Sequence, residues 1–94
     1  MSDTDLICTA IVQRRLLSFI YKSRRRCVEP HALGYDRDGD LTLSAWQLSG
    51  TTEGWRDFHL SKMTGLIIEQ QTFLRPRPDY NPPGKFPTRL VCRL

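Results

Sequence analysis

Two carboxylate–histidine pairs, Glu29 with His31 and Asp57 with His59, are the residues of this sequence best suited to acid–base chemistry. Each pair is spaced i, i+2, which in a β-strand places both side chains on the same face. A carboxylate beside a histidine is an arrangement that can transfer protons. However, no nucleophile motif, metal triad or phosphate-binding loop accompanies either pair. The sequence therefore predicts a protein that is not an enzyme and that needs no cofactor.

The potential metal ligands are also poorly arranged for binding. Cys27, His31 and His59 do not have the spacing of a zinc site. Residues 36–40 (Asp-Arg-Asp-Gly-Asp) lack the closing glutamate of a calcium-binding loop. A hairpin turn explains these aspartates better, because Asp38-Gly39 tolerates the positive φ angles of a type I′ turn. No metal site is predicted.

Arginines give a stronger indication of function. Arg24, Arg25 and Arg26 are consecutive, and Arg56 lies farther along the chain. A guanidinium presents a planar fork of donors that matches phosphate or carboxylate oxygens. Arg26 and Arg56 each adjoin an apolar strand pattern, which favours fixed side chains, whereas Arg24 and Arg25 could equally be solvated charges of a turn. All four are candidate residues for binding an anionic ligand.

Aromatic residues near these arginines extend the hypothesis. Tyr21, Trp46 and Trp55 could stack the bases of a nucleotide or of single-stranded DNA or RNA. The alternative is that both tryptophans are ordinary core or edge aromatics. We retain Tyr21 and Trp46 as candidates for stacking.

The positive charge is concentrated in particular segments. The net charge of the 94 residues is +4. Residues 1–74 hold nine basic and nine acidic residues, whereas residues 75–94 hold five basic residues against Asp79 alone. Residues 14–26 contain six basic residues and no acidic one. This sorting indicates an anionic partner more directly than the net charge does.

Length and composition predict one cytoplasmic domain. A chain of this size forms a single domain with one modest core. No apolar run is long enough to cross a membrane, and the acidic N-terminus does not resemble a secretory signal. Cys8, Cys27 and Cys92 are an odd number without Cys-x-x-Cys spacing. This argues against a disulfide framework and favours a reducing compartment.

The predicted elements are one helix followed by short strands. Residues 3–14 have an apolar stripe at helical spacing and an N-capping residue before it. The predicted strands are residues 16–22, 26–35, 40–48, 55–60 and 64–73. Pro30 suggests an edge, a bulge or a bend, because it donates no ladder hydrogen bond, and residues 23–25 form a turn. The fold class is mostly β with an N-terminal helix: a small, bent antiparallel sheet or barrel of about five strands.

The C-terminal segment differs from the rest in composition. Five of the six prolines lie in residues 76–87, which favours an extended, polyproline-like conformation. Residues 88–94 alternate enough to form a terminal strand. That strand could close on its own sheet or add to the sheet of a neighbour.

Three motifs occur in a fixed order along the chain. They are Arg26-x-Val28-Glu29-Pro30-His31-x-Leu33, Leu41-Thr42-Leu43-x-Ala45 and Trp55-Arg56-x-Phe58-x-Leu60, with a hairpin between the first two. Together they resemble the WYL domain, a ligand-sensing module of bacterial transcription regulators and phage-defence proteins. The resemblance covers roughly residues 6–73 and implies a domain at residues 1–74 followed by the proline-rich, basic tail at residues 75–94.

The resemblance implies an Sm-like, SH3-type barrel behind a short helix and a binding function toward anionic ligands. It implies a positively charged pocket at Arg26, His31 and Arg56, with Thr42 at the position of the family's tyrosine. Because the triplet reads Leu-Thr-Leu here, Tyr21 or Trp46 would have to supply the stacking group. Family members usually carry a DNA-reading domain before this one, which the chain has no room for. A regulator of this kind would act through a partner protein or as an assembly.

These observations lead to two hypotheses. The first is a sensor or accessory regulator, in transcription or phage defence, that binds a nucleotide or a single-stranded nucleic acid. Arg26 and Arg56 would contact phosphate, and His31 would form a hydrogen bond and tune binding with pH. The alternative is a protein-interaction or homo-oligomerisation module that assembles through the strand at residues 88–94 and binds no small ligand.

Overall fold

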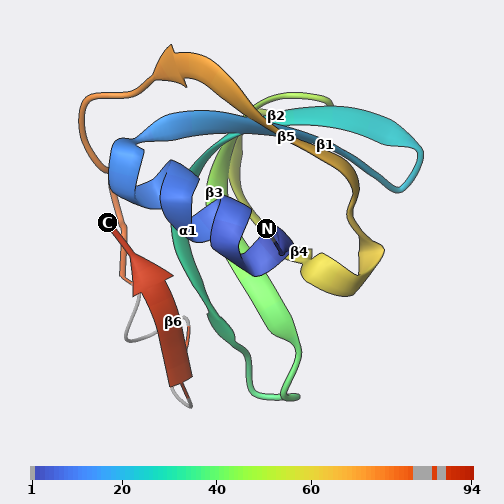
Figure 1. Ribbon diagram of the computed structural model, residues 1–94, viewed down its shortest axis with the longest axis vertical. Coiled ribbons are helices and arrows are strands. Elements are labelled where there is room, and N and C mark those ends of the chain that lie inside the picture. The colour runs from blue at the N-terminus through green and yellow to red at the C-terminus, as the bar shows by residue number, and fades with distance from the viewer. Residues whose placement is uncertain (1, 82–85, 87–88) are drawn as a thin grey trace.

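The computed structural model describes residues 2–81, 86 and 89–94 of the chain. The described residues form one helix, a short 3₁₀ turn and a six-stranded antiparallel sheet (Figure 1). In chain order the elements are α1 (Asp3–Gln13), β1 (Arg15–Tyr21), β2 (Arg24–Tyr35), β3 (Leu41–Ser49), β4 (Gly54–His59), η1 (Leu60–Lys62), β5 (Thr64–Thr72) and β6 (Arg89–Arg93). The predicted fold class, mostly β with an N-terminal helix, is confirmed. The Sm-like or SH3-type assignment stays a prediction.

The expected helix and strands all form, with ends shifted by at most two residues. The helix begins as predicted, because the Ser2 hydroxyl accepts a hydrogen bond from the backbone N–H of Asp5 at 3.1 Å. It ends at Arg14, whose left-handed φ of 54° turns the chain directly into β1. No helix in the described part of the chain is long and apolar enough to cross a membrane.

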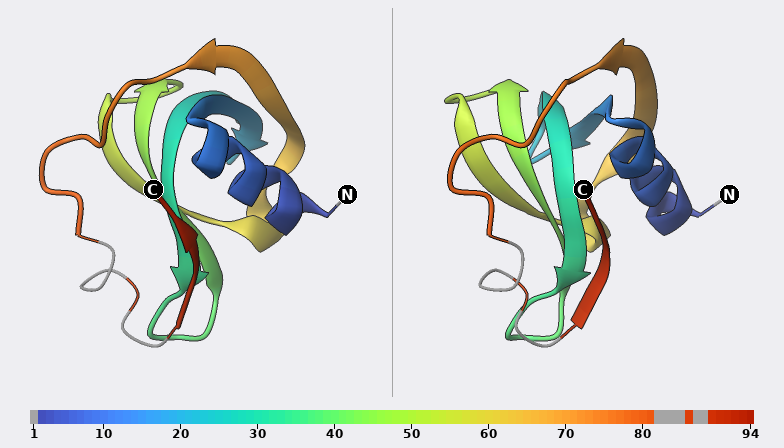
Figure 2. Two further views of the ribbon diagram at one scale, coloured as in Figure 1. Left: turned by 60° about the vertical axis from the view of Figure 1, so that its left-hand side comes forward. Right: turned by 90° about the vertical axis from the view of Figure 1, so that its left-hand side faces the viewer.

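The strands lie in the order β4-β3-β2-β1-β5, and β6 pairs with β2. Helix α1 packs on one face, the inner face, through its buried residues Ile7, Ala10 and Ile11. The opposite, outer face of β2, β3 and β4 is crossed by the segment that follows β5, drawn in orange in Figure 2. The two faces are therefore covered by opposite ends of the chain.

The core lies between the inner face and the helix. Its fully buried members come from α1 and from strands β1 to β4: Ile7, Ala10, Ile11, Leu17, Phe19, Val28, Leu33, Leu43 and Ala45, with Phe58 at 1% exposure. None of residues 74–81 belongs to this cluster. The core is thus complete without the segment that crosses the outer face.

Pro30 marks the place where β2 changes its partner. Residues 24–28 of β2 pair with β1, whereas residues 32–35 pair with β6. The register between β2 and β3 also shifts between Pro30 and Ala32, which is the predicted irregularity. A residue without a backbone N–H suits this point, because the ladder on that side is interrupted.

The turn between β1 and β2 is shorter than predicted. Tyr21 lies opposite Arg24, so the turn consists of Lys22 and Ser23 alone, and the prediction of a turn at residues 23–25 is wrong. Both turn residues have positive φ, 51° and 64°, as a two-residue hairpin requires. Arg24 is consequently a strand residue.

The hairpin between β2 and β3 has the predicted position but a different turn. Asp36 donates its backbone N–H to the Asp40 carbonyl, and Gly39 donates to the Asp36 carbonyl, both at 3.0 Å. The loop therefore has three residues, with only Gly39 at positive φ (82°), rather than the two of a type I′ turn. The Asp36 carboxylate stabilises this longer form by accepting the N–H groups of Asp38 and Asp40 at 2.9 and 3.0 Å.

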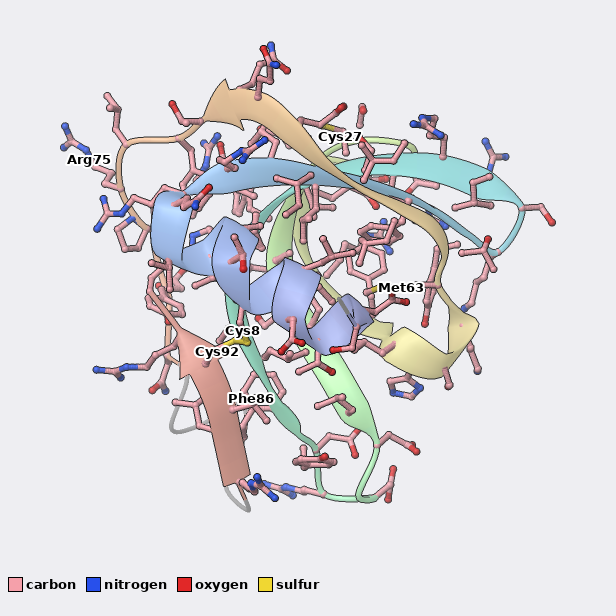
Figure 3. The ribbon with its side chains drawn as sticks, viewed as in Figure 1. Cys8, Cys27, Met63, Arg75, Phe86 and Cys92 are labelled. Atoms are coloured by element: carbon pink, nitrogen blue, oxygen red, sulfur yellow. A yellow bond between two sulfur atoms is a disulfide. The ribbon has the colours of Figure 1, made fainter. Side chains whose placement is uncertain are left out.

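Cys8 and Cys92 form a disulfide, which corrects the expectation of no disulfide framework (Figure 3). The bond joins α1 to β6 across 84 residues, with a Cα–Cα distance of 5.8 Å. Counting and spacing of cysteines missed it, because only the fold brings the helix beside the terminal strand. Cys27 is the unpaired cysteine. A disulfide is typical of oxidising environments, so the cytoplasmic location stays a prediction.

Candidate functional site

The structure divides the predicted binding residues between the two faces of the sheet. Arg26 lies on the inner face, with its guanidinium carbon 5.9 Å from the centre of the Phe58 ring. Arg56 precedes Phe58 by two residues on β4 and so shares its face. His31 lies on the outer face, in contact with the Trp55 ring at 4.8 Å. The structure therefore does not bring Arg26, His31 and Arg56 into one pocket.

Arg26 is held in a buried polar cage on the inner face. One terminal nitrogen, Nη1, donates to Gln47 Oε1 at 3.0 Å and to the Thr51 hydroxyl at 3.3 Å. The other, Nη2, donates to the Tyr21 carbonyl at 3.1 Å. The guanidinium also lies over the Tyr21 ring at 5.7 Å. The side chain is fixed by its neighbours, as predicted from its place beside an apolar strand pattern.

The charge of Arg26 has no acidic partner among the described residues. Both ion pairs found there involve other groups, and every acceptor of the Arg26 guanidinium is neutral. Its Nε is buried and has no hydrogen-bond partner. Arg26 is only 6% exposed. Burying a cation without a counter-ion is unfavourable, so the uncompensated charge of Arg26 costs this domain stability.

The other predicted arginines are exposed, and two of the three share the inner face with Arg26. Arg24 and Arg25 are exposed strand residues that precede Arg26 on β2. Arg24 lies opposite Tyr21, which places it on the inner face, whereas Arg25 lies opposite Ile20 on the outer face. Arg56 is exposed on the edge strand β4. Arg24 and Arg56 thus add solvent-accessible positive charge to the face that holds the Arg26 cage.

Tyr21 has a structural role in this arrangement. Its ring is 8% exposed and packs edge-on against Phe58 at 5.0 Å. Its hydroxyl accepts the backbone N–H of His59 at 3.2 Å. Tyr21 therefore ties β1 to β4 and forms one wall beside Arg26, rather than presenting a free ring for stacking.

On the outer face, Glu29, His31, Trp46 and Trp55 form a row that we call the aromatic groove. Glu29 lies opposite Trp46, and Trp46 lies opposite Trp55, so these side chains share a face across three strands. The Trp46 and Trp55 rings are 5.8 Å apart and nearly perpendicular. Residues 75–80, which we call the strap, cross this groove.

Arg77 of the strap makes the strongest contacts with the groove. Its guanidinium donates from Nε to Glu29 Oε1 at 2.7 Å and from a terminal nitrogen to Oε2 at 3.0 Å. The same group lies 4.9 Å from the centre of the Trp46 ring. These bonds to Glu29 raise the pKa of Arg77 above its already high usual value. Glu29 is therefore paired with an arginine, and its carboxylate does not bind His31.

His31 is completely buried beneath the strap. Its Nδ1 donates to the Glu29 carbonyl at 2.8 Å, and its Nε2 accepts the backbone N–H of Arg77 at 3.0 Å. The His31 ring also stacks on Phe73 at 5.5 Å. Burial lowers the pKa of the imidazole, so these bonds belong to the neutral ring.

Two further strap residues complete the contact. The Trp55 indole N–H donates to the Pro78 carbonyl at 2.8 Å. The Tyr80 hydroxyl donates to the His31 carbonyl at 3.1 Å, and the Tyr80 ring stacks on Trp55 at 6.3 Å. Burial raises the pKa of this hydroxyl, which keeps it protonated as a donor. The strap is thus bound by side chains and by single backbone groups, not by a strand ladder.

Arg77, Pro78 and Tyr80 were not among the predicted binding residues, because the composition of the proline-rich tail indicates a segment separate from the sheet. The sequence did indicate that Arg26 and His31 lie on opposite faces of the sheet. The two residues are five positions apart, and an odd spacing in a strand places side chains on opposite faces. The remaining candidate, Thr42, donates its hydroxyl to Asp36 Oδ2 at 3.2 Å and to the Asp40 carbonyl at 3.0 Å. It supports the hairpin.

Asp36, Asp40 and His59 are the described residues that come nearest to a metal site. Their ligand atoms lie within 4.8 Å of one another. However, Asp36 already accepts two backbone N–H groups of the hairpin and lies 3.3 Å from His59 Nε2. The hydrogen bond from the Asp40 backbone N–H is the largest of the effects that lower the pKa of the Asp36 carboxylate. The Asp36 carboxylate is thus engaged by the hairpin and by His59.

Comparisons with known proteins gave one match. The family model for the WYL domain matches residues 3–68, well over half of the chain. The match includes the Arg26 cage and all four residues of the aromatic groove, and it ends before the strap. No curated protein and no solved structure matches the chain.

Proposed function

The chain belongs to the WYL domain family, whose members are generally regulatory or sensor domains and not typically enzymes, and we propose that it senses an anionic ligand. The ligand is a nucleotide or a single-stranded DNA or RNA, and its phosphate binds at Arg26. In this role the protein is an accessory module of transcription regulation or phage defence.

The observation that carries the proposal is the unbalanced charge of Arg26. A buried guanidinium with only neutral acceptors and one unsatisfied N–H is a costly feature for a small domain. A phosphate oxygen would supply both the missing counter-charge and the missing acceptor. The presence of an arginine here, in place of an apolar residue, is therefore best explained by ligand binding.

The loop between β3 and β4 provides a route to this residue. Thr51 is exposed and belongs to that loop, and its hydroxyl is one of the acceptors of Arg26. A Cβ placed on Gly50 would lie 2.7 Å from Arg26 Cδ, so the loop backbone lies directly against the arginine side chain. Movement of this loop exposes the guanidinium, while the exposed Arg24, Arg25 and Arg56 attract the ligand from solution.

Fluorescence anisotropy with labelled single-stranded oligonucleotides and a labelled nucleotide, measured across a salt series, tests the proposal. We expect binding at low salt that weakens as salt rises, because each phosphate contact releases counter-ions. Arg24→Ala and Arg56→Ala should each weaken binding and reduce the salt dependence. Arg37→Ala is the matched control, because Arg37 is equally exposed but lies in the hairpin at the other end of β2.

Two results would overturn this function. The first is no detectable binding of any of the three ligand types at low salt. The second is binding that Arg24→Ala, Arg56→Ala and Arg37→Ala weaken to the same extent, since that would indicate general attraction to a basic protein and no site at Arg26.

A further inference from the structure

The aromatic groove has the composition of a recognition site for a cationic, extended peptide. It combines one nearly buried carboxylate, Glu29, with two indole rings and a neutral imidazole. Grooves lined by aromatic rings bind proline-rich segments, because such segments are already extended and lose little entropy on binding. Glu29 adds selectivity for a guanidinium at one position.

The strap shows which chemistry the groove accepts. Arg77 fills the position beside Glu29 with a bidentate ion pair and lies against Trp46. Pro78 then presents its carbonyl to the Trp55 indole at 2.8 Å. Tyr80 stacks on the same indole two residues later. Every one of these contacts depends on a short stretch, Arg-Pro-x-Tyr, and none requires the rest of the chain.

The strap can also detach from the aromatic groove without disturbing the hydrophobic core. Its contacts lie on the outer face, and the hydrophobic cluster contains none of its residues. The chain is tied down on both sides of the strap: Phe73 donates its N–H to the Arg14 carbonyl at 2.9 Å, and β6 is fixed to β2 and to Cys8. Detachment therefore changes the groove and leaves the sheet in place.

We propose that the aromatic groove is a binding site for an extended segment of a partner protein that carries arginine followed by proline, and that the strap occupies the site in its absence. The site lies on the face of the sheet opposite to Arg26, so it does not depend on the proposed anion site. A partner segment competes with an internal copy of the same chemistry. The strap thus lowers the apparent affinity of the groove for a partner segment, because that segment has to displace it.

A different protein fits this site better than a second copy of the chain. The strap is anchored at Phe73 and by β6, so reaching the groove of a neighbour would require the pairing between β2 and β6 to break. A separate peptide has no such restriction. Charge also selects the partner, because Glu29 is 6% exposed and needs a cation that can pair with both of its oxygens.

The test uses a synthetic peptide with the sequence of the strap, Arg-Pro-Arg-Pro-Asp-Tyr, and the full chain. The fluorescence of the protein reports directly on the groove, because both tryptophans of the chain lie in it. The wild-type protein should bind the peptide weakly, since the strap competes at a high effective concentration. Arg77→Ala removes the main contact of the strap, and we expect it to bind the peptide about tenfold more tightly or better.

Matched controls separate recognition from general effects. Arg75→Ala removes the same charge from an exposed side chain that points away from the fold in Figure 3, and should leave the peptide affinity at the wild-type value. A peptide with alanine in place of its second arginine should not bind. Glu29→Gln in the Arg77→Ala background should lose the gain. Circular dichroism of each variant verifies that the sheet is retained.

Three results would overturn the proposal. One is a folded Arg77→Ala protein that binds the peptide no better than the wild type does. Another is equal binding of the peptide that lacks its second arginine. The third is a concentration-dependent dimer of the wild-type chain that dissociates on addition of the peptide, because it would assign the groove to a second copy instead of a partner protein.

Discussion

Arg77 and Glu29 form a bidentate ion pair that holds the C-terminal segment against the middle of the sheet. The two bonds are 2.7 and 3.0 Å long. The side chain of Glu29 is 8% exposed, whereas that of Arg77 is 35% exposed. The carboxylate therefore depends on the arginine more than the arginine depends on the carboxylate, because Arg77 alone can be hydrated by solvent.

This asymmetry predicts the outcome of a double-mutant cycle. Arg77→Ala leaves a nearly buried carboxylate without its partner and should lower the free energy of unfolding by about 1–2 kcal/mol. Glu29→Gln together with Arg77→Ala should cost less than the sum of the single changes, with a coupling of about 1 kcal/mol, because solvent screens the exposed arginine. Urea unfolding of the wild type, the two single variants and the double variant measures each free energy of unfolding in the cycle. Strictly additive costs would mean that the pair contributes nothing.

Closure of the strap should weaken as the pH falls. His31 is neutral in the closed form, because its Nε2 accepts the Arg77 N–H and burial lowers its pKa below the ordinary value of 6.5. The open form therefore binds more protons, and the stability of the closed form is fully present above about pH 6.5 and lost progressively as the pH falls. Tryptophan fluorescence between pH 8 and pH 5 should report the opening.

The charged groups around His31 refine this expectation. Glu29 on β2 favours the protonated ring, whereas Arg77 on the strap disfavours it, and burial is the largest effect on the pKa. The Tyr80 hydroxyl stays protonated throughout this range, because burial raises its pKa. The transition should disappear in His31→Gln, which has no titrating ring. A transition that persists in this variant would assign the pH dependence to another group.

Much of the fold could be predicted because its signals are local. Alternation and helical spacing located the helix and every strand to within two residues, and Pro30 indicated the irregularity in β2, but the 3₁₀ turn at Leu60–Lys62 was not predicted. The turn at Lys22-Ser23 contains no glycine or asparagine, so nothing in its composition indicated two consecutive positive φ angles. The disulfide depends on α1 lying beside β6, a relationship that only the complete fold creates.

The site was harder to predict than the fold. The fixed position of Arg26 followed from its place in an apolar strand, but its lack of an acidic partner is a property of the assembled core. His31 was assigned to the same pocket by family resemblance, although the strand period places it on the other face. The docking of the strap could not be predicted, because composition indicates an extended segment without indicating the surface that it covers.

The disulfide should stabilise the closed arrangement of α1 and β6. Cys92→Ser removes a link that closes a loop of 84 residues, and we expect a loss of about 2–5 kcal/mol in the free energy of unfolding. Cys27→Ser is the control and should cost little, because Cys27 forms no disulfide. Thiol titration of the denatured, unreduced chain should find one free cysteine. Three free cysteines before reduction would show that the link does not form.

Anions should stabilise the protein through Arg26. A ligand that binds only the folded state raises its stability by RT ln(1 + [L]/Kd), so phosphate or a nucleotide should raise the Tm at constant ionic strength. Arg26→Met keeps the long apolar stem beneath Gly50 and Tyr21 but removes the charge. This variant loses hydrogen bonds to Gln47 and to the Tyr21 carbonyl, so its Tm without ligand should be lower.

The decisive quantity is the rise in Tm when anion is added. This rise should vanish in Arg26→Met and persist in the surface control Arg37→Ala. An equal rise in both variants would mean that anions stabilise the chain by general screening and that Arg26 binds none.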